Sequence, residues 1–228
     1  MNVCVLGDSG LMGQALVTAF LSSRANKVLG VSSADFSGNP NRPWNKAAYR
    51  HRKIDVLKDR GSFFNAVADF GTALLINSAA LVDLARCEKE TGLAEALNTR
   101  LPGELADFTK SNGARFIQIS TDQVFDGKKA LPYSENDVAK PLHVYGKTKL
   151  CGEQNALKKN PDTLVVRTNI VGFRDRKGHP TFAEWLSRCL ASKEPITLVD
   201  DFVTSSAHVD AVSEWIVGAC EGELKGLF

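Results

Sequence analysis

The chain has 228 residues, of which 43% are hydrophobic and 24% are charged, as in ordinary globular proteins. Its formal net charge of +2 is too small to indicate nucleic acid or an anionic membrane as a partner. No apolar run is long enough to span a bilayer, and the apolar segment from Asn2 to Leu6 is too short for a signal peptide. The 5 cysteines are scattered without metal-ligand spacing, so we expect reduced thiols, no metal site and a cytoplasmic location.

The N-terminal segment has the pattern of a dinucleotide-binding unit. Asn2 to Leu6 predicts a buried strand, and an amphipathic helix is expected from Leu11 to Arg24. Between them lie glycines with the GxxGxxG spacing. The first glycine makes the turn, the second admits a pyrophosphate, and the third lets helix and strand pack closely. A glycine-rich turn without a ligand is the alternative. The predicted cofactor contacts in this turn are Gly7, Ser9, Gly10, Leu11, Met12 and Gly13.

A second strand is expected from Lys27 to Val31, followed by Ser32 and Ser33. An NAD-binding protein usually has a carboxylate here, against the ribose 2′-hydroxyl. The two serines would not repel a 2′-phosphate, so both are predicted cofactor contacts and the segment favours NADP over NAD. Three downstream arginines are either phosphate ligands or solvated loop charges: Arg42, Arg50 and Arg52.

The middle of the chain alternates predicted loops, strands and helices. Residues 35–48 form a long loop, and residues 52–56 predict a third strand. Asp55 and Val56 at its end are candidate adenine contacts, although Asp55 could instead cap a helix beginning near Leu57. A fourth strand, residues 73–76, ends in small residues that leave room for the cofactor: Ser78, Ala79 and Ala80. A long helix, residues 93–111, carries Asn98, an unfavourable residue in a helix interior.

Tyr145 and Lys149 are the candidate catalytic pair. A helix is expected from Lys147 to Lys158, and four-residue spacing puts both side chains on one face of it. A lysine ammonium at about 4 Å favours the phenolate by about 4 kcal/mol at an effective dielectric near 20. We therefore expect Lys149 to lower the pKa of Tyr145 towards the range useful for proton transfer. The same spacing in Tyr49 and Lys53 falls in an extended run and does not predict a shared helical face.

A hydroxyl donor is expected beside this pair. Residues 115–119 predict a fifth strand, and Ser120 to Gln123 lie at its end, where a hydroxyl could donate to a substrate carbonyl. Further strands are expected at residues 163–166 and 196–199, with helices at 182–191 and 208–220. The alternation predicts an α/β protein of Rossmann type: a doubly wound parallel sheet with helices on both faces.

Together, these residues resemble the extended short-chain dehydrogenase/reductase family, in its dTDP-4-dehydrorhamnose reductase-like branch. The matching segments are Gly7 to Gly13, Ile76 to Ala80, Val82 and Asp83 with Glu88, Ser120 to Gly127, Tyr133 to Glu135, and Tyr145 to Glu153. The resemblance implies Thr121, Tyr145 and Lys149 as catalytic residues, with Asn98 holding a water for proton relay. Tyr145, Lys149 and Asn169 would also contact the nicotinamide end of the cofactor. The implied function is reduction of a nucleotide-linked keto-sugar with NADP or NAD, with a homodimer as a possible assembly.

Three departures from the family pattern bear on function. Gln123 stands where the related dehydratases have a glutamate base, and an amide cannot take up a proton. Asn169 and Ile170 replace the region of a family tryptophan. The C-terminal substrate-binding portion, residues 169–228, is shortened, so either the chain is truncated or the substrate pocket is open and different. Residues 1–168 form the expected cofactor-binding domain. Two alternatives remain: a non-catalytic NADP-binding protein resembling the methionine adenosyltransferase beta subunit, and a sugar-nucleotide epimerase.

Overall fold

The computed structural model describes residues 1–23, 26–36, 44, 47–174, 180–193, 195–200 and 203–228. In this part of the chain, one sheet contains 8 strands in the order β3-β2-β1-β4-β5-β6-β7, and β8 pairs with the first residues of β6. Every pairing is parallel. The strands are β1 (Asn2–Leu6), β2 (Lys27–Ser32), β3 (Tyr49–Lys53), β4 (Leu74–Asn77), β5 (Arg115–Thr121), β6 (Leu164–Val171), β7 (Ser206–His208) and β8 (Gly226–Leu227).

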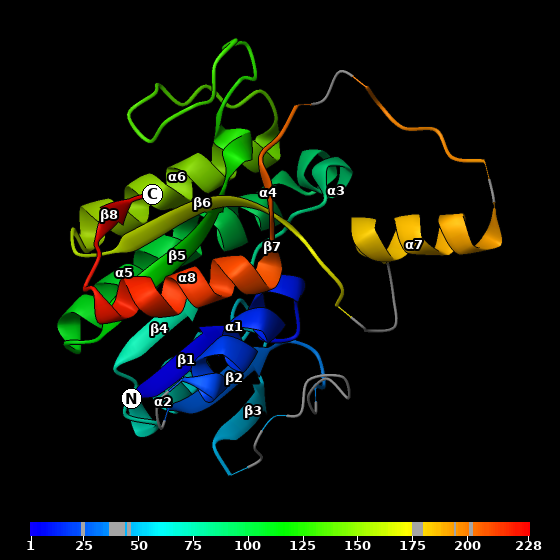
Figure 1. The fold of residues 1–228 in the computed structure, drawn as a ribbon. Coiled ribbons are helices and arrows are strands. Elements are labelled where there is room, and N and C mark those ends of the chain that lie inside the picture. The colour runs from blue at the N-terminus through cyan, green and yellow to red at the C-terminus, as the bar shows by residue number, and fades with distance from the viewer. Residues whose placement is uncertain (24–25, 37–43, 45–46, 175–179, 194, 201–202) are drawn as a thin grey trace.

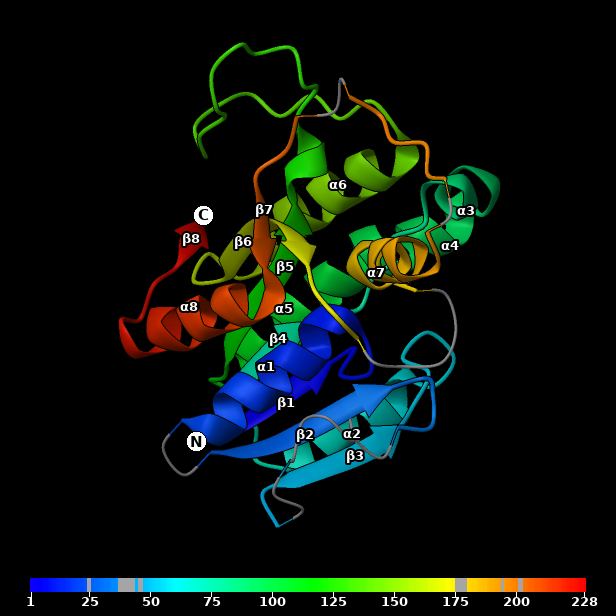
Figure 2. The same cartoon turned by 45° about the vertical axis from the view of Figure 1, so that its right-hand side comes forward.

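Helices cover both faces of the sheet (Figures 1 and 2). On one face lie α1 (Leu11–Ser22) and α8 (Val209–Glu221), and on the other lie α2 (Arg60–Asp69), α5 (Leu101–Ser111) and α6 (Val144–Lys159). Successive strand residues point to opposite faces of the sheet and belong to two separate apolar layers. In β1, Val3 and Val5 pack with α1, whereas Cys4 and Leu6 pack towards α2 and α5. The predicted Rossmann-type fold is thereby confirmed, and the carboxyl ends of β1 and β4 flank the crevice where strand order reverses.

Further helical segments lie between or beyond these layers. α3 (Leu84–Lys89) and α4 (Thr91–Ala94) precede a π-helical segment, η1 (Glu95–Arg100), which continues into α5. The predicted single helix over residues 93–111 is therefore wrong in one respect: its first half is widened into a π-helix. α7 (Phe182–Ser192) lies away from the sheet in both views (Figures 1 and 2).

Two strand predictions were wrong. The third strand spans Tyr49–Lys53 rather than residues 52–56, because it pairs with β2 from Val28 to Ser32. Residues 196–199 do not form a strand; instead Ser206–His208 pairs with the end of β6. The proposed boundary between residues 168 and 169 falls inside β6, so the last part of the chain shares the sheet. Among the described residues, no helix combines the length and apolar character needed to cross a membrane.

Candidate active site and cofactor cradle

The glycine turn closes tightly against the end of β4. Gly7 has φ +88°, and a Cβ on it would lie 2.8 Å from the Ala79 nitrogen. A Cβ on Gly13 would lie 2.1 Å from the Gly7 carbonyl oxygen. Gly7 therefore supplies the left-handed backbone of the turn, and Gly13 allows α1 to stack directly on it. These are the steric roles that the spacing predicts.

The N-terminus of α1 suits an anion. Gly10 is its N-cap and has no side chain to accept from the first turn. By contrast, α2, α3, α6, α7 and α8 each have a capping side chain. Because the first N–H groups of a helix lack intrahelical partners, the α1 terminus offers free donors and the positive end of the dipole. The residues present thus fit a dinucleotide pyrophosphate, with the half-buried Ser78, Ala79 and Ala80 facing it from β4.

Tyr145 and Lys149 lie one turn apart near the start of α6, and both are buried. The helix begins there because His143 accepts from the Gly146 nitrogen at 3.1 Å and Glu88 accepts from the Val144 nitrogen at 2.9 Å. The Lys149 ammonium donates to the Ile119 carbonyl of β5 at 2.6 Å. The pair is therefore fixed to the carboxyl end of the strand that leads to Thr121.

The expected lowering of the Tyr145 pKa by Lys149 is wrong. Burial raises the pKa of Tyr145 to about 12; a hydrogen bond with Thr121 lowers it in part, and the Asp122 carboxylate raises it. Burial also lowers the pKa of Lys149 to about 8, against the opposing effect of Glu153. Burial is the largest cause of both shifts, and neither residue is among the causes of the other's shift. Tyr145 is consequently a protonated phenol at neutral pH, which is the form that can donate a proton.

Thr121 reaches Tyr145 because the loop after β5 lies against the first turn of α6. This loop is a 3₁₀ turn, η2 (Asp122–Val124). A Cβ on Gly146 would lie 2.4 Å from the Gln123 carbonyl oxygen, so only glycine permits this approach. Thr121 Oγ1 accepts from the Gln123 nitrogen at 3.2 Å and donates to Asp122 Oδ1 at 3.2 Å.

Asn98 lies in η1 and is buried. Its side chain exchanges two hydrogen bonds of 2.9 Å with the Leu81 backbone and donates to Thr148 at 3.2 Å. A Cβ on Gly152 would lie 2.0 Å from the Asn98 carbonyl oxygen, so α6 packs closely on the π-helix. The side-chain amide thus ties η1 to α6, and the water-holding role stays a prediction.

A charged cluster next to the Tyr145–Lys149 pair holds α6 against the sheet. The sequence analysis did not predict this cluster. Arg167 of β6 donates to Glu153 at 2.6 Å through Nη2 and at 3.0 Å through Nε. The Ser120 hydroxyl donates to the same carboxylate. Glu153 is four residues after Lys149, and this spacing was the available signal. Asn169 is held beside the site, donating to Asp122 at 3.2 Å and to Thr204 at 2.8 Å.

The predicted adenosine contacts lie around the ends of β2 and β3. Ser32 is buried and donates to the Ala34 carbonyl at 3.4 Å, whereas Ser33 is exposed. Asp55 accepts from the Leu57 nitrogen at 3.1 Å, and Val56 is buried. The cap of α2 is Asp59, which accepts from the Ser62 nitrogen at 3.0 Å, because α2 begins at Arg60 rather than near Leu57. Of the three arginines, Arg50 and Arg52 are exposed on β3, and Arg42 lies outside the described residues.

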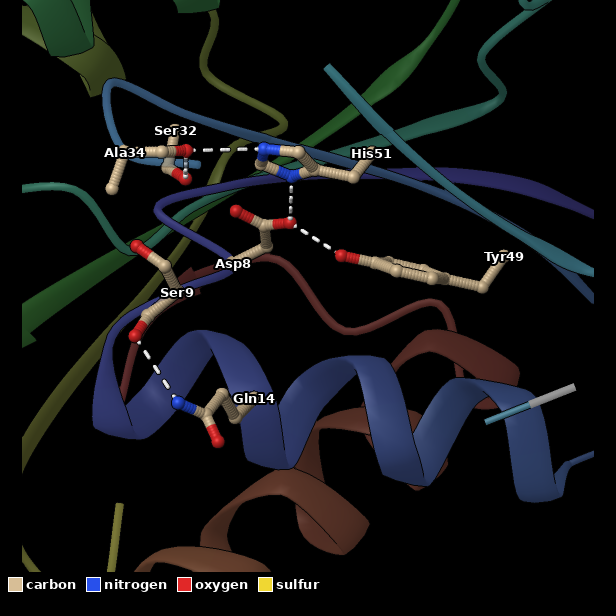
Figure 3. A network of polar contacts seen from close by, with 7 residues as sticks. All are labelled: Asp8, Ser9, Gln14, Ser32, Ala34, Tyr49 and His51. Carbon is tan, nitrogen blue, oxygen red and sulfur yellow. Dashed lines mark hydrogen bonds and ion pairs between the residues drawn. The ribbon is translucent and has the colours of Figure 1, made fainter. Parts of the chain in front are cut away.

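A buried acidic network lies next to this region and was not predicted. Asp8, in the glycine turn, contacts Tyr49 and His51 of β3 (Figure 3). Tyr49 is thus a strand residue, and the prediction that it shares no helical face with Lys53 is confirmed. The signal in the sequence was the carboxylate itself, placed directly after Gly7.

The doubly wound sheet, the glycine turn and the Tyr145–Lys149 pair define the extended short-chain dehydrogenase/reductase class. The chain belongs to the family described as "RmlD substrate binding domain", whose model matches residues 1–227. This confirms the predicted dTDP-4-dehydrorhamnose reductase-like branch.

Relatives and solved structures agree with this assignment. The chain is 29% identical to the "Probable low-salt glycan biosynthesis reductase Agl14" of Haloferax volcanii, over 100% of the chain and 73% of that protein. It is 36% identical to a dTDP-4-dehydrorhamnose reductase of Streptomyces griseus, over 86% of the chain but only 58% of the relative. The crystal structure of the Bacillus anthracis dTDP-4-dehydrorhamnose reductase in complex with NADP has a TM-score of 0.78 and 23% identity, over 100% of this chain and 73% of that one. The chain thus spans less than two thirds of the length of some curated relatives.

Proposed function

We propose that this chain is an NAD(P)-dependent reductase that acts on a nucleotide-linked keto-sugar of the dTDP-4-dehydrorhamnose type. The observation that carries the proposal is the buried pair on α6, with Tyr145 hydrogen-bonded to Thr121 and Lys149 anchored on β5. The names of the curated relatives support the substrate class, and the NADP complex of the Bacillus anthracis protein supports the cofactor class.

The chemistry assigned to these residues is proton delivery. The bound nicotinamide would supply the hydride to the carbonyl carbon. Tyr145, kept protonated by burial at neutral pH, gives its proton to the carbonyl oxygen, so hydride and proton together make an alcohol. The Thr121 hydroxyl, which donates to Asp122 in the structure, turns its one proton to the same oxygen and orients it. Lys149, whose pKa of about 8 lies near neutrality, can return a proton to the phenolate.

Neighbouring groups support this arrangement. Glu153 and Arg167 fix α6 from behind, and Gly146 lets Thr121 approach. Gln123 follows Asp122 where a dehydratase needs a base, and its amide takes up no proton, so the site favours reduction over dehydration. Asn98 remains the candidate for a relay through ordered water, and Asn169 for a contact near the nicotinamide.

The test is oxidation of NADPH and NADH, followed by absorbance, with dTDP-4-dehydrorhamnose as substrate. We expect turnover by the wild type and a loss of about 10²–10⁴-fold in Tyr145→Phe, the range for a general acid. Tyr133→Phe is the matched control, because Tyr133 donates to Asp126 in a surface loop at 2.7 Å. Cofactor binding without turnover on nucleotide-linked keto-sugars would support the non-catalytic alternative instead.

A further inference from the structure

Asp8 is a fully buried carboxylate in the turn that faces the cofactor. The Tyr49 hydroxyl donates to its Oδ2 at 2.7 Å, and His51 Nδ1 lies 2.8 Å from the same oxygen (Figure 3). Gly30 of β2 makes the room, since a Cβ there would lie 2.0 Å from Oδ2. A buried charge is costly unless it is paired and hydrogen-bonded, so three elements of the fold combine to keep a carboxylate at this place.

His51 is a basic side chain in contact with this carboxylate. Its Nδ1 faces the Asp8 carboxylate, and its Nε2 faces the Ala34 carbonyl at 3.2 Å. Both neighbours are acceptors, and an imidazole ring donates from both nitrogens only when it is protonated. The ring of His51 thus lies between two acceptors, within ion-pair distance of Asp8 on one side. Burial together with the Asp8 carboxylate also raises the pKa of Tyr49, which keeps that hydroxyl a donor.

The second oxygen of Asp8 is the unexplained group. Oδ1 is buried and has no hydrogen-bond partner among the described residues. In Figure 3 it points away from Tyr49 and His51, to the side on which Ser9 and Ser32 lie. Ser9 belongs to the glycine turn and Ser32 ends β2. In dinucleotide-binding folds, the adenosine ribose binds between these two elements.

We propose that Asp8 accepts a hydrogen bond from the ribose 2′-hydroxyl of the cofactor's adenosine and makes this chain select NAD(H) over NADP(H). The proposal rests on the cofactor binding that forms part of the proposed function. Ser32 and Ser33 stand where a β2 carboxylate is usual, and Asp8 supplies a carboxylate from the glycine turn instead. A hydroxyl has a proton to donate to Oδ1. A 2′-phosphate carries nearly two negative charges at neutral pH. It would therefore repel the carboxylate and would offer it no proton.

Arg50 and Arg52, two of the arginines that suggest NADP, do not offset this preference. Side chains alternate along a strand, so Tyr49 and His51 share the face of β3 that carries Asp8. Arg50 and Arg52 consequently lie on the other face, where both are exposed. Neither is positioned to neutralise a phosphate beside Asp8. The inferred preference is thus the reverse of the one that the two serines indicate.

The experiment measures Kd by fluorescence titration of NADH, NADPH and 2′-deoxy-NADH. We expect the wild type to bind NADH at least about tenfold more tightly than either of the others, as for a hydrogen bond to a charged acceptor. In Asp8→Asn, the ratio of the NADPH and NADH Kd values should fall towards one. Asp69→Asn makes the same charge change at the exposed end of α2 and should leave the ratio unchanged.

Equal or tighter binding of NADPH by the wild type would overturn the proposal, as would an unchanged ratio in folded Asp8→Asn. The 2′-deoxy probe needs no variant, so unchanged affinity for it refutes the role of Asp8 even if the variant fails to fold. These are binding constants, independent of turnover. If the protein is not a reductase, the preference for binding NADH is still expected. If Asp8 does not set that preference, only the ratios of the Kd values differ from those expected.

Discussion

Replacing Lys149 by methionine should stabilise the protein while abolishing turnover. Burial lowers the pKa of Lys149 from 10.5 to about 8, and one pKa unit corresponds to about 1.4 kcal/mol. Keeping this ammonium charged in the folded state therefore costs about 3 kcal/mol at neutral pH. Methionine has a similar length and removes the charge. The Ile119 carbonyl keeps a donor, because Gln118 Nε2 also donates to it at 2.7 Å.

The sign of the pH dependence follows from linkage. Below pH 8 Lys149 is charged in both the folded and the unfolded states, so the full cost is present. As pH rises from about 8 towards 10.5, the folded state loses its proton first and the cost disappears. The advantage of Lys149→Met should thus shrink from about 3 kcal/mol at pH 7 to about 1 kcal/mol at pH 10.

Urea unfolding at both pH values measures this difference, and a rise in Tm of about 5–10 °C at pH 7 should accompany it. The matched control is Lys147→Met, since Lys147 is on the same helix but exposed; it should give no such gain. The reasoning is refuted if Lys149→Met is less stable than the wild type at pH 7. It is also refuted if the stability gain of the variant is as large at pH 10 as at pH 7. In that case the ammonium would contribute to stability through contacts stronger than its desolvation cost.

Three further substitutions test the packing and hydroxyl contacts around the pair. Gly152→Ala forces α6 away from η1, because the added Cβ would lie 2.0 Å from the Asn98 carbonyl oxygen. It should lower the free energy of unfolding, measured in urea, by about 1–3 kcal/mol. The control Gly218→Ala, in open space on α8, should instead be neutral or stabilising. Glu153→Gln removes the carboxylate that pairs with the buried Arg167, so a loss of about 3 kcal/mol or more is expected, and a loss below about 1 kcal/mol would contradict the pairing. Thr121→Val removes the hydroxyl beside Tyr145 and should lower kcat about 10²-fold with cofactor affinity unchanged; unchanged kcat would exclude its role.

The glycine turn and the alternation of strands and helices were predictable because they depend on local rules. Gly7, Gly10 and Gly13 have a spacing that only a strand, turn and helix unit explains, and short β-branched runs separated by helices imply a parallel sheet. The Tyr145–Lys149 pair was found because four-residue spacing on a helix is visible in the sequence.

Other features depend on contacts between distant segments. The Asp8 network needs the pairing of β3 with β2, which brings Tyr49 and His51 within hydrogen-bond distance of residue 8. The π-helix around Asn98 depends on its packing against Gly152, and no helix propensity signals it. The pKa of Tyr145 was misjudged because spacing gives the nearness of a charge but not the degree of burial, and burial has the larger effect.

The most direct test of the central claim follows a deuterium atom. Reduced nicotinamide cofactor deuterated at C4 on the transferred face is incubated with the protein and dTDP-4-dehydrorhamnose, and the product is examined by mass spectrometry. If the site beside Tyr145 reduces the sugar carbonyl, the product sugar carries the deuterium and Tyr145→Phe forms almost none. A bound cofactor that keeps its deuterium, with the keto-sugar recovered unchanged, would contradict the assignment of this chain as a reductase.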